Sequence, residues 1–177
     1  MGRVHLGGVV ASAALVLVAV ALAFFGSRND PSGSVDREPR LVSTEELAAT
    51  PAEVEHAVYW AAQRPPTRLE LTVEADGSVY IRYRSPGKSG ADRPESPLTV
   101  GSYPVEDALA ATRAAAVEEG ATLRHLPGGA VAFQDPRAGR SAYLAFPGED
   151  VQVEVFDPQP GKALALVRAG EIEQVGE

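Results

Sequence analysis

Side chains that often carry chemistry are scarce in this chain. It has no cysteine and three histidines, and 24 acidic against 16 basic residues give a formal net charge of −8. The absence of cysteine excludes disulfides, thiolate nucleophiles and thiolate metal sites. The acidic balance argues against a nucleic-acid-binding protein that relies on basic patches. We therefore expect no nucleic-acid partner.

The histidines form no complete catalytic or metal-binding motif. Glu53 and His56 have the i, i+3 spacing found in carboxylate-bridged metal bundles, but such bundles need two copies, so a solvated helix face is the simpler interpretation. His125 precedes a glycine pair that loosely resembles an oxyanion loop, without a matching nucleophile. An envelope hydrolase would need a deep pocket that holds His125 or His56 beside a carboxylate and a hydroxyl. We assign no catalytic, cofactor-binding or metal-ligating residue and expect no cofactor.

Tyr80, Arg82 and Arg84 alternate along one predicted strand and therefore project from the same face. Tyrosine and arginine are enriched where protein interfaces gain most of their binding energy. These three residues are our candidate interaction face. The alternative is that a helix covers them and that they are structural.

Trp60 and Tyr103 are the candidate aromatic residues of a ligand pocket. The connection from Ser85 to Pro97, rich in Pro, Gly and Ser, is unusually long for a compact domain. If it closes over a pocket that contains Trp60 or Tyr103, the chain is a small-molecule-binding or sensing domain.

The strongest structural signal is a β-hairpin between residues 68 and 84. Apolar and polar residues alternate in 68–74 and again in 78–84, as in two half-buried strands. A two-residue turn would set core side chains opposite polar ones. A three-residue loop, Ala75-Asp76-Gly77 with Gly77 left-handed, instead pairs Val73 with Val79, Leu71 with Ile81 and Leu69 with Tyr83. We predict this loop, which also sets Glu70 opposite Arg82 and Thr72 opposite Tyr80.

The remaining pattern predicts further helices and strands. Two short helical turns are expected near Ser43-Thr-Glu-Glu46 and Thr50-Pro51, and a short helix over Lys162 to Ala169. A longer helix is expected between Tyr103-Pro104 and Gly120, with Val105, Leu109 and Val117 as the large members of its buried stripe. Strands are expected over 57–61, 98–102, 121–126, 130–134, 142–146 and 151–156, with an edge strand over 171–175. The fold class is therefore α+β, with one mainly antiparallel sheet packed by one longer and one or two short helices.

Leu6 to Phe25 is an uncharged, mostly apolar run. As a helix it would be about 30 Å long, which matches the hydrocarbon core of a bilayer. The alternative is a cleaved secretory signal, because Ala21-Leu22-Ala23 resembles a cleavage site. The run exceeds a usual signal core, so we favour a retained transmembrane signal-anchor helix in residues 1–25.

A flexible linker is expected over residues 26–42, because they contain almost nothing to bury, and a soluble domain over 43–177. The orientation has two interpretations. The positive groups near the membrane are Arg3 and the α-amino group before the run, against Arg28, Arg37 and Arg40 after it, which favours a cytoplasmic domain. The signal-like layout favours an extracytoplasmic domain, and we prefer that one.

Five segments carry a resemblance: Val58–Ala61, Leu69–Thr72, Val79–Tyr83, Leu98–Pro104 and Val151–Pro158. On these segments the chain resembles uncharacterised single-pass membrane-anchored proteins of high-GC Gram-positive bacteria. The likeness covers about residues 54 to 175 and implies a folded module. It brings no known activity, cofactor or catalytic residue.

These observations predict a single-pass protein of the cell membrane, anchored in the lipid bilayer by its N-terminal helix. Its extracytoplasmic domain is expected to be an interaction or structural module, with a protein partner still to be identified. A sensing domain and an envelope hydrolase are the alternatives, and no reaction is predicted.

Overall fold

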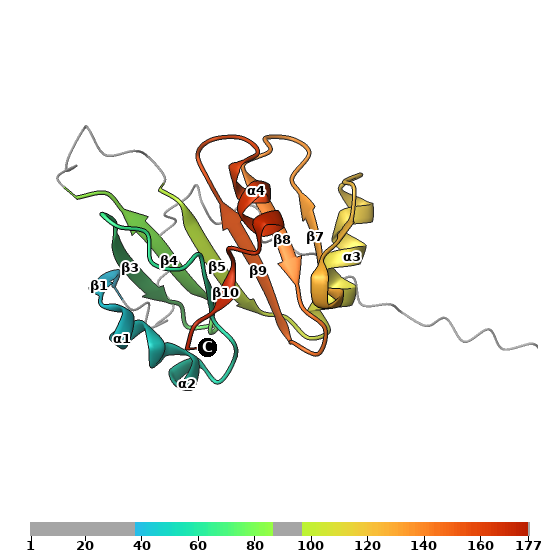
Figure 1. Cartoon of the computed structure of the whole chain (residues 1–177). Helices are drawn as coiled ribbons and strands as arrows, with labels where there is room; N and C mark the ends of the chain where they lie inside the picture. The colour runs from blue at the N-terminus through green and yellow to red at the C-terminus, as the bar shows by residue number, and fades with distance from the viewer. Residues whose placement is uncertain (1–37, 87–96, 177) are drawn as a thin grey trace, which may run out of the picture. The chain divides into compact units, whose positions relative to one another are not determined.

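The computed structural model describes residues 38–86 and 97–176 (Figure 1). The predicted membrane-spanning run Leu6 to Phe25, most of the predicted linker and most of the connection from Ser85 to Pro97 lie outside the described residues. Among the helices that are described, none is long and apolar enough to cross a membrane.

The described residues form an α+β fold built on one large antiparallel sheet, and the predicted class is confirmed at that level. The sheet contains eight strands, in spatial order β1 (Arg40–Val42), β3 (Arg68–Val73), β4 (Val79–Arg84), β5 (Thr99–Pro104), β9 (Val151–Phe156), β8 (Ser141–Ala145), β7 (Val131–Gln134) and β6 (Arg124–His125). A second, small antiparallel sheet pairs β2 (Tyr59–Trp60) with β10 (Glu173–Gln174).

The hairpin of β3 and β4 has the predicted register. Val73 faces Val79, Leu71 faces Ile81 and Leu69 faces Tyr83. Gly77 has φ +87°, a conformation that side-chain-bearing residues rarely adopt. The Asp76 carboxylate accepts a hydrogen bond from the Ser78 amide at 2.8 Å, which closes the turn.

Most of the apolar core lies on one face of the sheet. Helix α4 (Lys162–Ala169) packs against β8 and β9 on this face, and the short helices α1 (Thr44–Ala48) and α2 (Thr50–Val54) add Leu47 and Val54 to the same core. The small sheet joins them: the Tyr59 amide donates to Ser102 Oγ at 2.9 Å, and the Ala61 amide donates to the Tyr83 hydroxyl at 2.7 Å. Each large apolar side chain buried here contributes about 1.5–3 kcal/mol.

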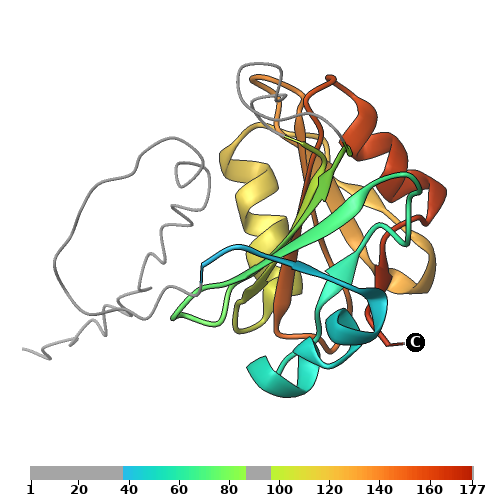
Figure 2. The same ribbon diagram turned by 90° about the vertical axis from the view of Figure 1, so that its left-hand side faces the viewer.

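Helix α3 (Ala108–Glu118) packs on the opposite face, against β7, β8 and β9 (Figure 2). Its buried residues are Ala108, Thr112 and Ala116. The expectation that Val117 belongs to the buried stripe is wrong, because that side chain is 81% exposed. An i, i+4, i+8 stripe of small residues lets the helix lie close to the sheet, and Val117 falls beside this stripe.

The start of α3 also differs from the expectation. β5 continues to Pro104, which is paired with Val151, so the chain is still extended where the helix was expected to begin. Asp107 then caps the helix, and its carboxylate accepts from the Ala110 amide at 3.3 Å.

The folded domain begins before residue 43. Arg40–Val42, which we expected within the linker, form strand β1, and Leu41 pairs with Glu70 of β3. Ser43 then forms the predicted capping box with Glu46 at the start of α1. A three-residue strand gives too short an alternation to be recognised among polar neighbours.

Candidate interaction face

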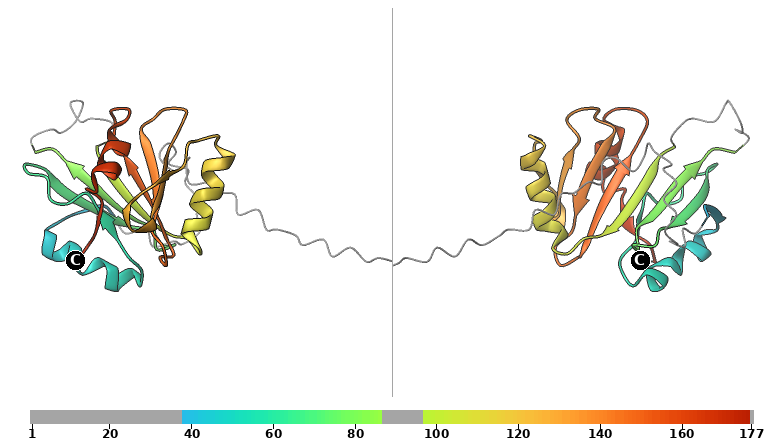
Figure 3. Two further views of the ribbon diagram at one scale, coloured as in Figure 1. Left: turned by 45° about the vertical axis from the view of Figure 1, so that its right-hand side comes forward. Right: turned by 180° about the vertical axis from the view of Figure 1, so that it is seen from behind.

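The face of the sheet that carries α3 is only partly covered by helix. α3 lies over β7, β8 and β9, whereas no helix within residues 38–86 and 97–176 lies over β3 and β4 on this side (Figure 3). Leu41, Arg68, Glu70, Tyr80, Arg82 and Arg84 project from this part of the sheet, as their pairing requires. We call these six residues the arginine face.

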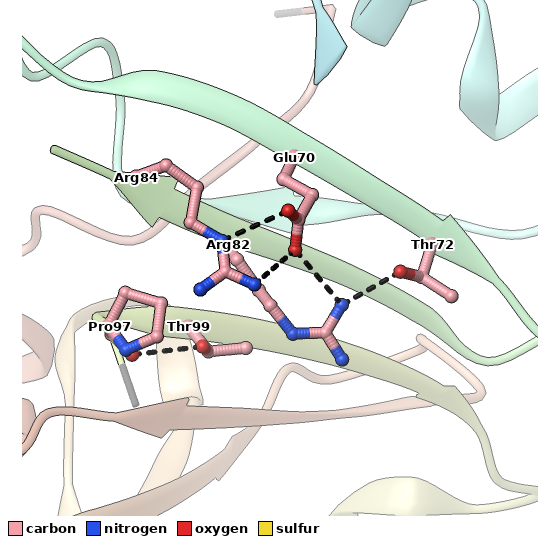
Figure 4. A network of polar contacts seen from close by, with 6 residues as sticks. All are labelled: Glu70, Thr72, Arg82, Arg84, Pro97 and Thr99. Carbon is pink, nitrogen blue, oxygen red and sulfur yellow. Dashed lines mark hydrogen bonds and ion pairs between the residues drawn. The ribbon is translucent and has the colours of Figure 1, made fainter. Parts of the chain in front are cut away.

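Glu70 organises two arginines of the neighbouring strand (Figure 4). Arg84 donates from Nε and Nη2 to the two carboxylate oxygens of Glu70, at 3.0 and 2.6 Å. Arg82 donates from Nη1 to the Thr72 hydroxyl at 2.7 Å and lies 3.9 Å from Glu70 Oε1. The two-point contact orients the Arg84 guanidinium on Glu70. The hydrogen bond to Thr72 orients Arg82, so each arginine has a partner within the sheet before any other protein binds.

Tyr80 lies between this network and the centre of the sheet. Its ring meets Tyr103 edge to face, with centroids 5.7 Å apart and an interplanar angle of 79°, and the Arg82 guanidinium carbon lies 5.3 Å from the Tyr80 centroid. Burial raises the pKa of the Tyr80 hydroxyl, and the nearby acids Glu74 and Asp76 raise it further. Tyr80 is therefore uncharged and rigidly packed, with part of its surface exposed.

Tyr103 occupies the space above Gly101. A Cβ atom on Gly101 would lie 2.7 Å from the Tyr103 hydroxyl oxygen and 2.9 Å from Cζ, closer than real side chains approach. The missing side chain allows the ring to reach the next strand, where its hydroxyl donates to Glu154 Oε2 at 2.9 Å. Gly101 is thus required for close packing.

Glu154 is a buried carboxyl group at the centre of this face. It is 4% exposed and lies within hydrogen-bonding reach of the hydroxyls of Ser141, Tyr103 and Tyr143. Burial raises its pKa, the three hydroxyls oppose that shift, and Asp135 adds to it. Glu154 is not among the predicted site residues, because in the sequence it is only one of the polar residues that alternate with valines in β9. No local signal in the sequence marks it, because Gly101 stands opposite Glu154 only through the long-range pairing of β5 with β9.

Among the residues predicted to form an interaction face, Tyr80, Arg82 and Arg84 do share one surface, and Arg82 and Arg84 share Glu70 as a partner. The two pocket aromatics are not brought together. Trp60 belongs to the small sheet, which packs on the Ser102 side of β5, whereas Tyr103 projects from the other side.

The histidines also lie apart from the arginine face. His56 is half-buried, and its ring nitrogens lie 2.8 Å from the carbonyl oxygens of Ala57 and Gly77. His125 is exposed on β6. Within residues 38–86 and 97–176, neither histidine has a carboxylate partner, and no group of three or more acidic or histidine residues there could hold a metal.

Comparison of the chain with family models, curated proteins and solved structures found no match.

Proposed function

We propose that this protein is a binding module whose contact surface is the arginine face. The observation that carries the proposal is the Arg82–Glu70–Arg84 network, ordered on a part of the sheet that no described helix covers. An interface gains most from aromatic and arginine side chains that are already held in position, because less conformational entropy is lost on binding. Tyr80, Arg82 and Arg84 have these properties.

The proposal includes a membrane tether. The apolar run Leu6 to Phe25 has the length and composition of a bilayer-spanning helix, and we propose that it holds the domain at the outer side of the cell membrane. The resemblance to single-pass membrane-anchored proteins supports this location. The chain should then stay with membranes in alkaline carbonate, and protease added outside intact cells should degrade the domain. Release by carbonate would contradict the tether, and protection from the protease would contradict the location at the outer side of the membrane.

The contact surface is tested by affinity capture with the tagged full chain, taken in mild detergent from cells that produce it. Tyr80→Ala combined with Arg82→Ala removes one aromatic and one charged group from the arginine face. Arg113→Ala combined with Val117→Ala is a matched control, because both residues are exposed on α3.

Quantitative mass spectrometry of the captured proteins should show partners whose recovery falls at least about tenfold with the first variant, which corresponds to a loss of about 1.4 kcal/mol in binding free energy. The recovery of the same partners should stay unchanged with the control. Equal recovery with both variants would rule out the arginine face as the contact surface.

A further inference from the structure

We infer that the arginine face receives an acidic peptide segment of a partner protein, with carboxylates of that segment bound by Arg82 and Arg84. This assignment rests on the proposed function and adds the chemistry of the partner.

Charge is the first reason. The whole chain carries −8, yet the arginine face holds three arginines and one glutamate. Arg68 is exposed and stands opposite Arg84, so positive charge is concentrated where β3 begins and β4 ends. Glu74 and Asp76 lie toward the other end of the hairpin, at its turn. A partner with carboxylates at the Arg84 end complements this separation of charge.

The hydrogen-bonding capacity of the two guanidinium groups is the second reason. Arg84 uses Nε and Nη2 for Glu70, and Arg82 uses Nη1 for Thr72 and Glu70 (Figure 4). Within the described residues, Arg84 Nη1 and the Nε and Nη2 atoms of Arg82 have no hydrogen-bond acceptor. Each guanidinium therefore keeps N–H donors suited to a carboxylate of a partner, while Glu70 holds Arg84 and Thr72 holds Arg82.

The neighbouring groups favour a peptide over a uniform polyanion. Glu70 places a negative charge between the two arginines, which a densely charged phosphate polymer would meet directly. Leu41 is 56% exposed and pairs with Glu70, so an apolar side chain borders the charged groups. Spaced carboxylates together with an apolar residue match this arrangement, and a short peptide segment supplies both.

The assignment is tested with the full chain in detergent micelles and a dye-labelled synthetic peptide that carries glutamates on either side of a leucine. Fluorescence anisotropy should show saturable binding that weakens as salt is added. The same peptide with glutamine in place of glutamate should bind at least about tenfold more weakly, because the charge-assisted hydrogen bonds are lost.

Protein variants test the two arginines individually. Arg82→Lys and Arg84→Lys keep the charge and remove the planar guanidinium with its several donors. Each substitution should lower the affinity for the peptide by about threefold to tenfold. Arg113→Lys on α3 changes an exposed arginine outside the face and should leave binding unchanged. Circular dichroism of each variant identifies any that fails to fold, and the glutamine peptide tests the same contact on the unaltered protein.

Four results would overturn the assignment: equal binding of the glutamate and glutamine peptides, equal loss with Arg113→Lys, equally tight binding of polyphosphate or phosphatidylglycerol vesicles, or self-association that depends on Arg82 and Arg84. If the acidic peptide does not bind but captured partners still depend on Tyr80 and Arg82, the acidic-peptide assignment fails and the proposed function stands. If the captured partners are also unaffected by those substitutions, both fail.

Discussion

Replacing Glu154 by Gln should make the stability of this protein less dependent on pH. The carboxyl group is 4% exposed, and burial raises its pKa in the folded protein. In the unfolded chain the same group titrates near the ordinary value of about 4.3. Between these two pKa values the folded protein binds more protons than the unfolded chain, so the free energy of unfolding falls as pH rises.

The size of the effect follows from the pKa difference. For each unit by which the pKa in the folded protein exceeds that in the unfolded chain, the free energy of unfolding falls by about 1.4 kcal/mol at a pH where the carboxyl group is ionised in both states. Glutamine has a similar shape, accepts hydrogen bonds through its carbonyl oxygen and does not ionise. The variant should therefore gain stability relative to the natural chain as pH rises through the folded pKa, and the gain should level off above it.

Urea unfolding at a series of pH values measures this difference, with the fluorescence of Trp60, the one tryptophan of the chain, as the signal. Glu118→Gln, at an exposed position on α3, is the control for removing a surface carboxylate, and its pH profile should run parallel to that of the natural chain. Parallel profiles for Glu154→Gln and the natural chain, or a variant that loses relative stability with rising pH, would refute the proposed burial effect.

Other substitutions test the packing of this face. Gly101→Ala should lower the free energy of unfolding by about 2–4 kcal/mol, since the new Cβ would lie 2.7 Å from the Tyr103 hydroxyl, and the loss should shrink in a Tyr103→Leu background when both are measured by urea unfolding. Thr112→Val should lower the free energy of unfolding by about 1–3 kcal/mol, because Gln152 Nε2 donates to Thr112 Oγ1 at 2.9 Å. Adding Gln152→Leu should recover most of this loss, and additive losses in the double variant would contradict this buried contact. Thr50→Val should raise the melting temperature, because Thr50 Oγ1 is buried with no hydrogen-bond partner among the described residues, and a lower value would show that the hydroxyl has one.

Local alternation was enough to predict several elements. The register of β3 and β4 followed from the sequence, because only one loop length places Leu69, Leu71 and Val73 opposite apolar residues. The bounds of β9 and α4 were also predicted correctly, since Gly170 ends the helix where the apolar pattern ends.

The pairing of strands that are distant in the chain could not be predicted from the sequence. β5 pairs with β9, about fifty residues further along the chain, and no local turn indicates that contact. The burial of Glu154 depends on this pairing and on the neighbouring Tyr103 and Tyr143, so the local pattern of β9 does not predict it. Tyr80, Arg82 and Arg84 could be grouped because they share one strand. Glu70 was predicted opposite Arg82, but its two-point contact with Arg84 was found only in the structure.

Site-specific photo-crosslinking in intact cells tests most directly whether the arginine face contacts a partner. A photoreactive amino acid is placed at position 41, beside the arginine pair, or at position 117, an apolar site on α3 that is more exposed than position 41. We expect a discrete crosslinked product from position 41 that disappears with Arg82→Ala plus Arg84→Ala, and no such product from position 117. The same product from both positions, or one from position 41 that persists without the two arginines, would contradict the account.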